Sequence, residues 1–133
     1  MATLYEYLLD CNFEKYLDRL VLELDGKPVI VYGTGSMFQL IQENYDLSKL
    51  NIIGISDGKY SVNDDGKEDL GYKIISKENI KSHNVDAVLL GVKNYENLQT
   101  SFKENLLLND SVKILPLVKK SLLVQIKEFF LDF

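Results

Sequence analysis

The residues best suited to chemistry form a short glycine loop that follows an apolar run. Residues 29–36 read VIVYGTGS, which places Gly33 and Gly35 one residue apart. The first glycine of such a pair permits a tight turn, and the second lets the backbone approach a phosphate without an intervening Cβ. Amide groups at the start of the following helix can then bind an anion. The expected phosphate contacts are Gly33, Thr34, Gly35 and Ser36; the alternative is a plain turn between a strand and a helix.

The loop matches only part of the dinucleotide-binding fingerprint. That fingerprint reads G-x-G-x-x-G, and Phe38 stands at the third glycine position here. The third glycine normally allows close packing of the helix on the strand, which a phenylalanine cannot provide in the same way. The sequence therefore disfavours a tightly packed pyrophosphate-binding turn.

A carboxylate follows the next apolar run, where the fingerprint places an acid. Residues 51–55 read NIIGI, and Asp57 lies 24 positions after Gly33. An acid about 20 residues beyond the glycines accepts a hydrogen bond from a ribose hydroxyl. We expect Asp57 to contact the ligand; the alternative is that Asp57 and Gly58 form a turn after the strand.

A third strand end adds Lys93 and Asn94 to the candidate site. Gly91 interrupts an apolar run at residues 86–92, and a glycine at such a position indicates close approach of two backbone segments. Lys93 and Asn94 then lie at the same edge of the sheet as the glycine loop, in reach of a phosphate or a base edge. In the alternative interpretation, Asn94 caps the helix that follows.

The other reactive residue types suggest no further site. His83 and Cys11 are the single histidine and the single cysteine, which excludes a structural zinc cluster and an intrachain disulfide. We expect His83 in an exposed loop and Cys11 in a packed position. The acidic run at residues 64–69 lacks the spacing of a calcium loop, so we expect a solvated loop there. Ser36 is not in a G-x-S-x-G elbow, and the catalytic residues stay unknown.

Composition limits the partners and the compartment. The net charge is −5 and the isoelectric point is about 4.9, which argues against nucleic acid as a partner because such binding needs a basic face. No stretch approaches the roughly 20 apolar residues of a membrane span, so we expect no membrane partner. One cysteine and the lack of a signal-peptide pattern favour a cytoplasmic protein.

Apolar periodicity predicts that strands and helices alternate. Spacings of three and four over residues 3–24 predict one or two helices with a break near Asn12. Short apolar runs predict strands at residues 29–32, 51–55, 72–75, 86–92 and 112–115. Helices are expected at residues 37–44, 76–82, 95–107 and 119–131, with Ser76 as an N-cap and Asn79 in the place of a capping-box glutamate.

This alternation predicts an α/β fold: a Rossmann-like three-layer sandwich with a mostly parallel sheet flanked by helices. Ligands of such sheets bind beyond the carboxyl ends of the strands, where the glycine loop falls. We expect one Rossmann-like domain over residues 1–133. Its parts are a leading helical segment at 1–25, a core at 27–117 and a closing helix at 119–131.

Four segments, taken in order, resemble a set of bacterial Rossmann-like domains. They are residues 29–36, 53–57 (IGISD), 71–76 (GYKIIS) and 86–92 (DAVLLGV). The set comprises the N-terminal sugar-nucleotide-binding domains of bacillosamine-pathway acetyltransferases. Similar domains occur in polysaccharide-biosynthesis nucleotide-sugar epimerases and dehydratases, and at the C-terminal end of some sugar methyltransferases. The resemblance covers about residues 27–107.

The resemblance implies a ligand class and a missing catalytic part. In the acetyltransferases the glycine loop and the acid face a uridine-nucleotide sugar, which implies the same role here for Gly33, Gly35, Ser36 and Asp57. Those enzymes continue into a left-handed β-helix that holds the catalytic histidine and the coenzyme A site. This chain ends at Phe133 without hexapeptide repeats, so we expect a binding domain that lacks the catalytic half.

Three functions remain open from the sequence. The first is a module for a small-molecule nucleotide ligand, either a nucleotide-sugar or NAD(P), in bacterial surface-polysaccharide metabolism. The second is a small NAD(P)-dependent oxidoreductase or epimerase, which the sequence disfavours because Gln99 stands where a Tyr-x-x-x-Lys pair from Tyr95 would place the lysine. The third is a ligand-free interaction subunit whose terminal helices form a homo-oligomer or bind a partner subunit rather than cover the sheet.

Overall fold

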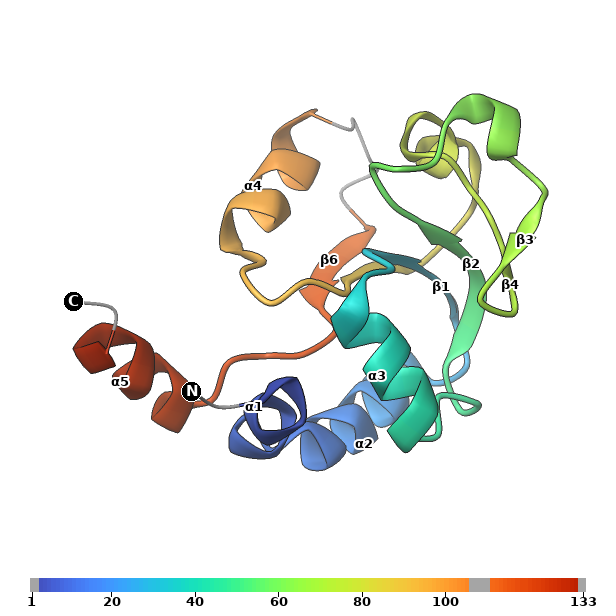
Figure 1. Cartoon of the computed structure of the whole chain (residues 1–133). Helices are drawn as coiled ribbons and strands as arrows, with labels where there is room; N and C mark the ends of the chain where they lie inside the picture. Colours follow the sequence, from blue (N-terminus) through green and yellow to red (C-terminus); the bar gives the residue numbers. More distant parts are fainter. Residues whose placement is uncertain (1–2, 106–110, 132–133) are drawn as a thin grey trace.

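A computed structural model describes residues 3–105 and 111–131 of the chain. Its centre is a four-stranded sheet in the order β2-β1-β5-β6, in which every neighbouring pair is parallel (Figure 1). The strands are β1 (Pro28–Tyr32), β2 (Asn51–Ser56), β5 (Ala87–Leu90) and β6 (Lys113–Pro116). Helices flank the sheet, so the predicted α/β, Rossmann-like fold class is confirmed.

The central strands are apolar because both of their faces are covered. Residues 29–32 of β1 and all of β5 are buried. Their side chains alternate between two separate clusters, with Val29 and Val31 in one and Ile30 in the other. Such continuous apolar runs are typical of parallel strands between two helical layers.

One helical layer consists of α1 (Leu4–Asp10), α2 (Phe13–Leu24) and α3 (Ser36–Asn44). The predicted break between the two leading helices falls at Asn12, whose φ of 52° is left-handed. Phe13, Leu20 and Phe38 from this layer are almost fully buried in the first cluster. The leading helices therefore pack onto the body of the protein.

The second layer consists of the 3₁₀ helix η2 (Lys77–Ser82) and α4 (Glu96–Asn105). Ile80 and Phe102 are fully buried against the strands of the second cluster. Phe102 also meets Tyr32 of β1 edge-to-face, with ring centroids 4.8 Å apart. The helix expected at residues 95–107 corresponds to α4. Residues 106–107 of that expected helix lie outside the described residues.

The polar segment at residues 59–71 has more structure than its composition predicts. It contains the 3₁₀ helix η1 (Val62–Asp64) and strand β3 (Glu68–Asp69), which pairs with β4 (Tyr72–Lys73) in a hairpin. The Asp65 carboxylate accepts hydrogen bonds from the amide and hydroxyl of Ser76 and from the side chain of Asn79. Ser76 precedes η2 as predicted, but its side chain accepts no hydrogen bond from that helix; its hydroxyl donates to Asp65.

The closing helix α5 (Leu122–Leu131) begins three residues later than predicted and lies beside α1, away from the sheet (Figure 1), where Lys127 pairs with Asp10 of α1 at 2.9 Å. Val124 is buried in the first core cluster, whereas Leu122, Phe129 and Phe130 are exposed. Among residues 3–105 and 111–131, no helix combines the length and apolar character needed to cross a membrane.

Candidate functional site

The glycine loop leaves β1 through a turn that only glycine suits. Gly33 has a φ of +106°, and its amide donates to the carbonyl of Ser56 at 2.8 Å. A Cβ on Gly33 would lie 2.8 Å from Cγ1 of Val92. The backbone conformation and the lack of space both require glycine here.

Gly91 faces Gly33 across the ends of β1 and β5. A Cβ on Gly91 would lie 2.5 Å from the carbonyl oxygen of Gly33, closer than real Cβ contacts come. The close backbone approach predicted at Gly91 is therefore present. It brings residues 91–94 beside the glycine loop, as the parallel order of β1 and β5 requires.

Gly35 differs from these two glycines because it borders open space. Its φ is −80°, and no atom lies within 4 Å of the position that a Cβ would take. Gly35 is the N-cap of α3 and, like Ser36, is exposed. The amides of Ser36, Met37 and Phe38 donate no hydrogen bond to any described residue. This edge therefore offers unpaired amide donors next to a position without a side chain.

Asp57 lies against the loop, and Thr34 is its main partner. Oδ2 of Asp57 accepts from the Thr34 amide at 2.8 Å and from the Thr34 hydroxyl at 2.9 Å. Thr34 is fully buried, and its carbonyl accepts from Nε2 of Gln39 at 3.0 Å. All the polar groups of Thr34 are therefore used within the protein, and this residue positions the loop.

The second carboxylate oxygen of Asp57 is less occupied. Oδ1 accepts a hydrogen bond from the Lys59 amide at 3.1 Å. Burial acts to raise the pKa of the Asp57 carboxyl, but the hydrogen bonds from Thr34 and Lys59 outweigh burial and hold that pKa below its ordinary value. Asp57 is therefore ionised at neutral pH and can accept one further hydrogen bond through Oδ1.

The hydrogen bonds of Asp57 make the stability of the loop dependent on pH. Because the folded-state pKa is lowered, the contribution is present above the unfolded-state pKa of roughly 3.9 and is lost as the pH falls through the folded value. We expect Asp57→Asn to lower the free energy of unfolding by about 1–2 kcal/mol at pH 7. The difference from the natural protein should start to shrink below about pH 4, where this carboxyl protonates in the unfolded chain, and should be lost below the lower folded-state pKa of Asp57.

Urea denaturation from neutral to acid pH measures this difference. Asp18→Asn is the matched control, since Asp18 is an exposed carboxylate on α2 without a hydrogen bond to any described residue. A difference between Asp57→Asn and the natural protein that stays constant down to the acid limit would contradict the anchoring role of the carboxylate.

Lys93 and Asn94 lie at the expected edge but have partners within the protein. Nζ of Lys93 lies 4.6 Å from the ring centroid of Tyr7 on α1. Oδ1 of Asn94 accepts from Nζ of Lys120 at 3.2 Å. Helix α4 begins at Glu96, so Asn94 lies two residues before its first turn rather than next to it. Both side chains are exposed and must leave these partners to reach a ligand.

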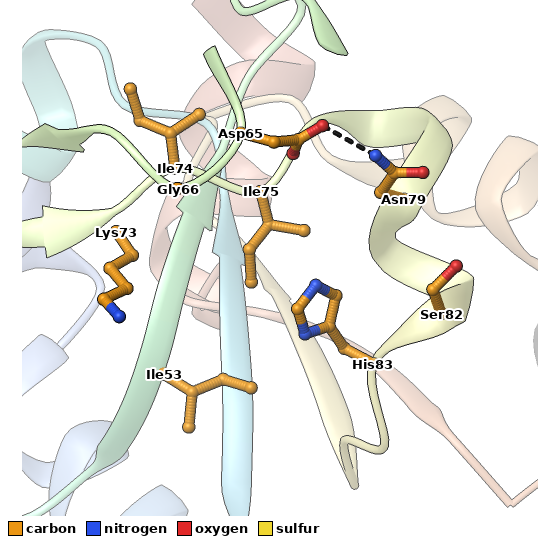
Figure 2. Close-up of a pocket in the computed structure, with 9 residues that line it drawn as sticks. All are labelled: Ile53, Asp65, Gly66, Lys73, Ile74, Ile75, Asn79, Ser82 and His83. Carbon is orange, nitrogen blue, oxygen red and sulfur yellow. Dashed lines mark hydrogen bonds between the residues drawn. The ribbon is translucent and has the colours of Figure 1, made fainter. Parts of the chain in front are cut away.

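The largest of the described cavities does not include the glycine loop. It measures about 500 Å³ and lies beside β2 and η2, with Ile53 and Ile75 on its apolar side (Figure 2). Figure 2 shows the imidazole of His83 turned toward these residues, with the hydrogen bond from Asn79 to Asp65 at the other end. His83 is exposed as expected but lines this cavity, which the sequence did not indicate.

Two further expectations concern packing and metals. Cys11 is buried as expected, and burial raises the pKa of its thiol. Within the described part of the chain, no three histidine, cysteine or carboxylate side chains are grouped to hold a metal ion.

A solved structure resembles the chain in fold. It is described as "Crystal structure of RSP in complex with beta-NAD+ and operator DNA"; the identity is 18% and the TM-score is 0.48. The match covers 90% of this chain and 62% of the other, so this chain spans less than two thirds of its neighbour. No curated protein matches the chain.

This neighbour corrects the prediction about nucleic acid. We excluded nucleic acid as a partner from the total charge of −5, yet the neighbour was crystallised with operator DNA. A net charge sums over the whole surface and does not describe the local patches that meet a partner, so it is no ground for excluding nucleic acid.

A family model matches the sequence over most of its length. The sequence model of the family described as "C2185-like, N-terminal" covers residues 26–106, from the turn before β1 to the end of α4. That range contains the glycine loop, Asp57, Lys93 and Asn94. The chain belongs to the C2185-like, N-terminal family.

Proposed function

We propose that the glycine-loop edge of the sheet binds a nucleotide through its phosphate groups. The observation that carries the proposal is the group of free amides at Ser36, Met37 and Phe38 beside the open space at Gly35. Amides at a helix start attract anions through their N–H groups and through the helix dipole. The position outside the carboxyl ends of β1 and β2 is where open parallel sheets bind ligands.

The remaining residues of the site have distinct roles in this proposal. Gly33 and Thr34 hold the loop in shape, and Gly35 and Ser36 contact the phosphate. Asp57 anchors Thr34 through Oδ2 and accepts a ribose hydroxyl through Oδ1. Lys93 and Asn94 turn from their present partners toward the ligand.

The finer assignment rests on the sequence resemblance. We infer a nucleotide-sugar ligand and a place in bacterial surface-polysaccharide or sugar-nucleotide metabolism, with NAD(P) as the other member of the ligand class. Residues 27–117 form the binding core in this proposal, and residues 1–25 and 119–131 are helical additions to one domain.

The experiment is calorimetric titration with UDP-glucose, NAD⁺ and coenzyme A, on the natural chain and on Gly35→Ala. The added methyl group lies in open space in the free protein but occupies the place of the phosphate. We expect binding of a nucleotide with a dissociation constant below about 1 mM, weakened about tenfold or more by Gly35→Ala.

Glu43→Ala, at the far end of α3, is the matched control and should bind like the natural chain. The melting temperature of Gly35→Ala shows whether the variant is folded. Failure of all three ligands to bind, or equal binding by Gly35→Ala and the natural chain, would refute the proposal.

A further inference from the structure

We propose that a hollow beside α2, separate from the glycine loop, binds the phosphate group of a small phosphorylated molecule. The hollow, named here the α2 groove, lies between Lys15, Tyr16 and Arg19 of α2 and the segment at residues 115–121. It consists of two cavities of about 250 and 360 Å³, which share Tyr16, Arg19 and Lys119 as walls.

The α2 groove carries an unbalanced positive charge. Lys15, Arg19 and Lys119 line the groove, and none of them forms an ion pair or a side-chain hydrogen bond with a described residue. Lys120 also lines it but is neutralised by Glu96 at 2.9 Å and by Glu128 at 3.1 Å. Three unpaired cations around one hollow, in a chain of net charge −5, form a local site for an anion.

The start of α2 opens into the same groove. Asn12 lines the groove with a left-handed φ of 52°, and its side chain forms no cap for the helix. The amides of Phe13, Glu14 and Lys15 donate to no described residue. A phosphate among the three cations would therefore also meet free amides at the positive end of a twelve-residue helix.

The α2 groove also has space for the rest of the ligand. The second cavity adds an apolar wall of Tyr95, Leu115 and Pro116. The Tyr16 hydroxyl donates to the carbonyl of Pro116 at 2.6 Å, which holds the ring of Tyr16 between the two cavities. Glu23 also lines this part and is paired with Lys113 at 3.1 Å. The groove therefore suits a molecule with an anionic end and a flat, less polar end.

The arrangement favours a small molecule over a polynucleotide. A nucleic acid is held by several cations spread along its backbone, and each phosphate contact adds to the salt dependence. The three unpaired cations here surround one hollow rather than follow a track. Two cavities of this size hold a ligand of small-molecule dimensions.

The test is calorimetric titration of the full chain with pyrophosphate, ADP and adenosine. We expect pyrophosphate and ADP to bind, ADP more tightly, and adenosine to bind at least about tenfold more weakly than ADP. Arg19→Gln and Lys119→Gln should each weaken pyrophosphate binding about tenfold. Lys49→Gln removes the same charge from an exposed lysine outside the groove and should change the affinity less than about twofold.

Amide chemical shifts locate the ligand and separate this site from the glycine loop. Pyrophosphate should shift the amides of residues 13–15 and 119–121, and Gly35→Ala should leave those shifts unchanged. Absence of pyrophosphate binding at millimolar concentration, or equal losses in Arg19→Gln and Lys49→Gln, would overturn the proposal. So would a short oligonucleotide that binds more tightly than ADP and loses affinity in the same variants, because the groove would then be a nucleic-acid surface.

Discussion

Replacing Phe38 with glycine is expected to lower the free energy of unfolding by about 4–6 kcal/mol. Phe38 is fully buried in the first core cluster, and its ring lies 6.3 Å from that of Tyr72. Removing a buried phenylalanine side chain costs about 3–5 kcal/mol, and glycine within a helix costs roughly a further 1 kcal/mol. Small domains have a total stability of about 5–15 kcal/mol, so this variant should be marginally stable or largely unfolded.

This variant also tests what the third fingerprint position does in this fold. Phe38→Gly completes the letters G-x-G-x-x-G but opens a cavity between α3 and the sheet, so the pattern and the packing make opposite predictions. Urea denaturation measures the loss, with Glu43→Gly on the exposed side of the same helix as control at about 1 kcal/mol. If the two variants lose the same stability, Phe38 does not fill the core as described.

The order of the elements could be predicted because burial on two faces leaves a plain pattern in the sequence. β1 and β5 are continuous apolar runs, and the structure places both in the middle of the sheet. The break at Asn12 could be predicted because the apolar spacing of the leading helices changes there. The exposed apolar face of α5 could not be predicted, because Phe129 and Phe130 are residue types typical of a core but lie outside the core.

The partners of the polar residues were less predictable than the elements. The sequence placed Gly33, Gly91 and Asp57 at one edge of the sheet, because the carboxyl ends of parallel strands share an edge. It did not indicate that Asp57 bonds to Thr34, since a loop and an acid 23 residues apart carry no mark of a direct contact. Asp65 was missed for the same reason: its partner Ser76 lies 11 residues away, beyond a hairpin.

The α2 groove shows why total charge is a poor guide to local binding. Lys15 and Arg19 share a helix face by their spacing of four, but Lys119 joins them only through the path of the chain after β6. A search of the sequence for basic runs does not find this group of cations, because the three residues are not adjacent in the chain.

Substituting alanine at Gly33 or Gly91 is expected to lower the free energy of unfolding by about 2–4 kcal/mol each. At Gly33 the strain of a φ of +106° adds to the contact with Val92, and at Gly91 the new methyl group meets the carbonyl of Gly33 at 2.5 Å. Backbone atoms cannot rotate away as a flexible side chain can, so the ends of β1 and β5 must separate. Gly35→Ala is the matched control and should cost no more than about 1 kcal/mol, the loss of a favoured N-cap.

The double variant Gly33→Ala with Gly91→Ala provides the sharper measurement. Both methyl groups press on the same gap between two strand ends, so the first substitution already forces the separation that the second requires. The combined loss should therefore be smaller than the sum of the single losses, by about 1 kcal/mol or more. If urea denaturation shows that the two losses of unfolding free energy are strictly additive, the two strand ends move independently. The rigid juxtaposition that fixes the glycine loop beside residues 91–94 would then be absent in solution, and Lys93 and Asn94 would lose their place in the proposed nucleotide site.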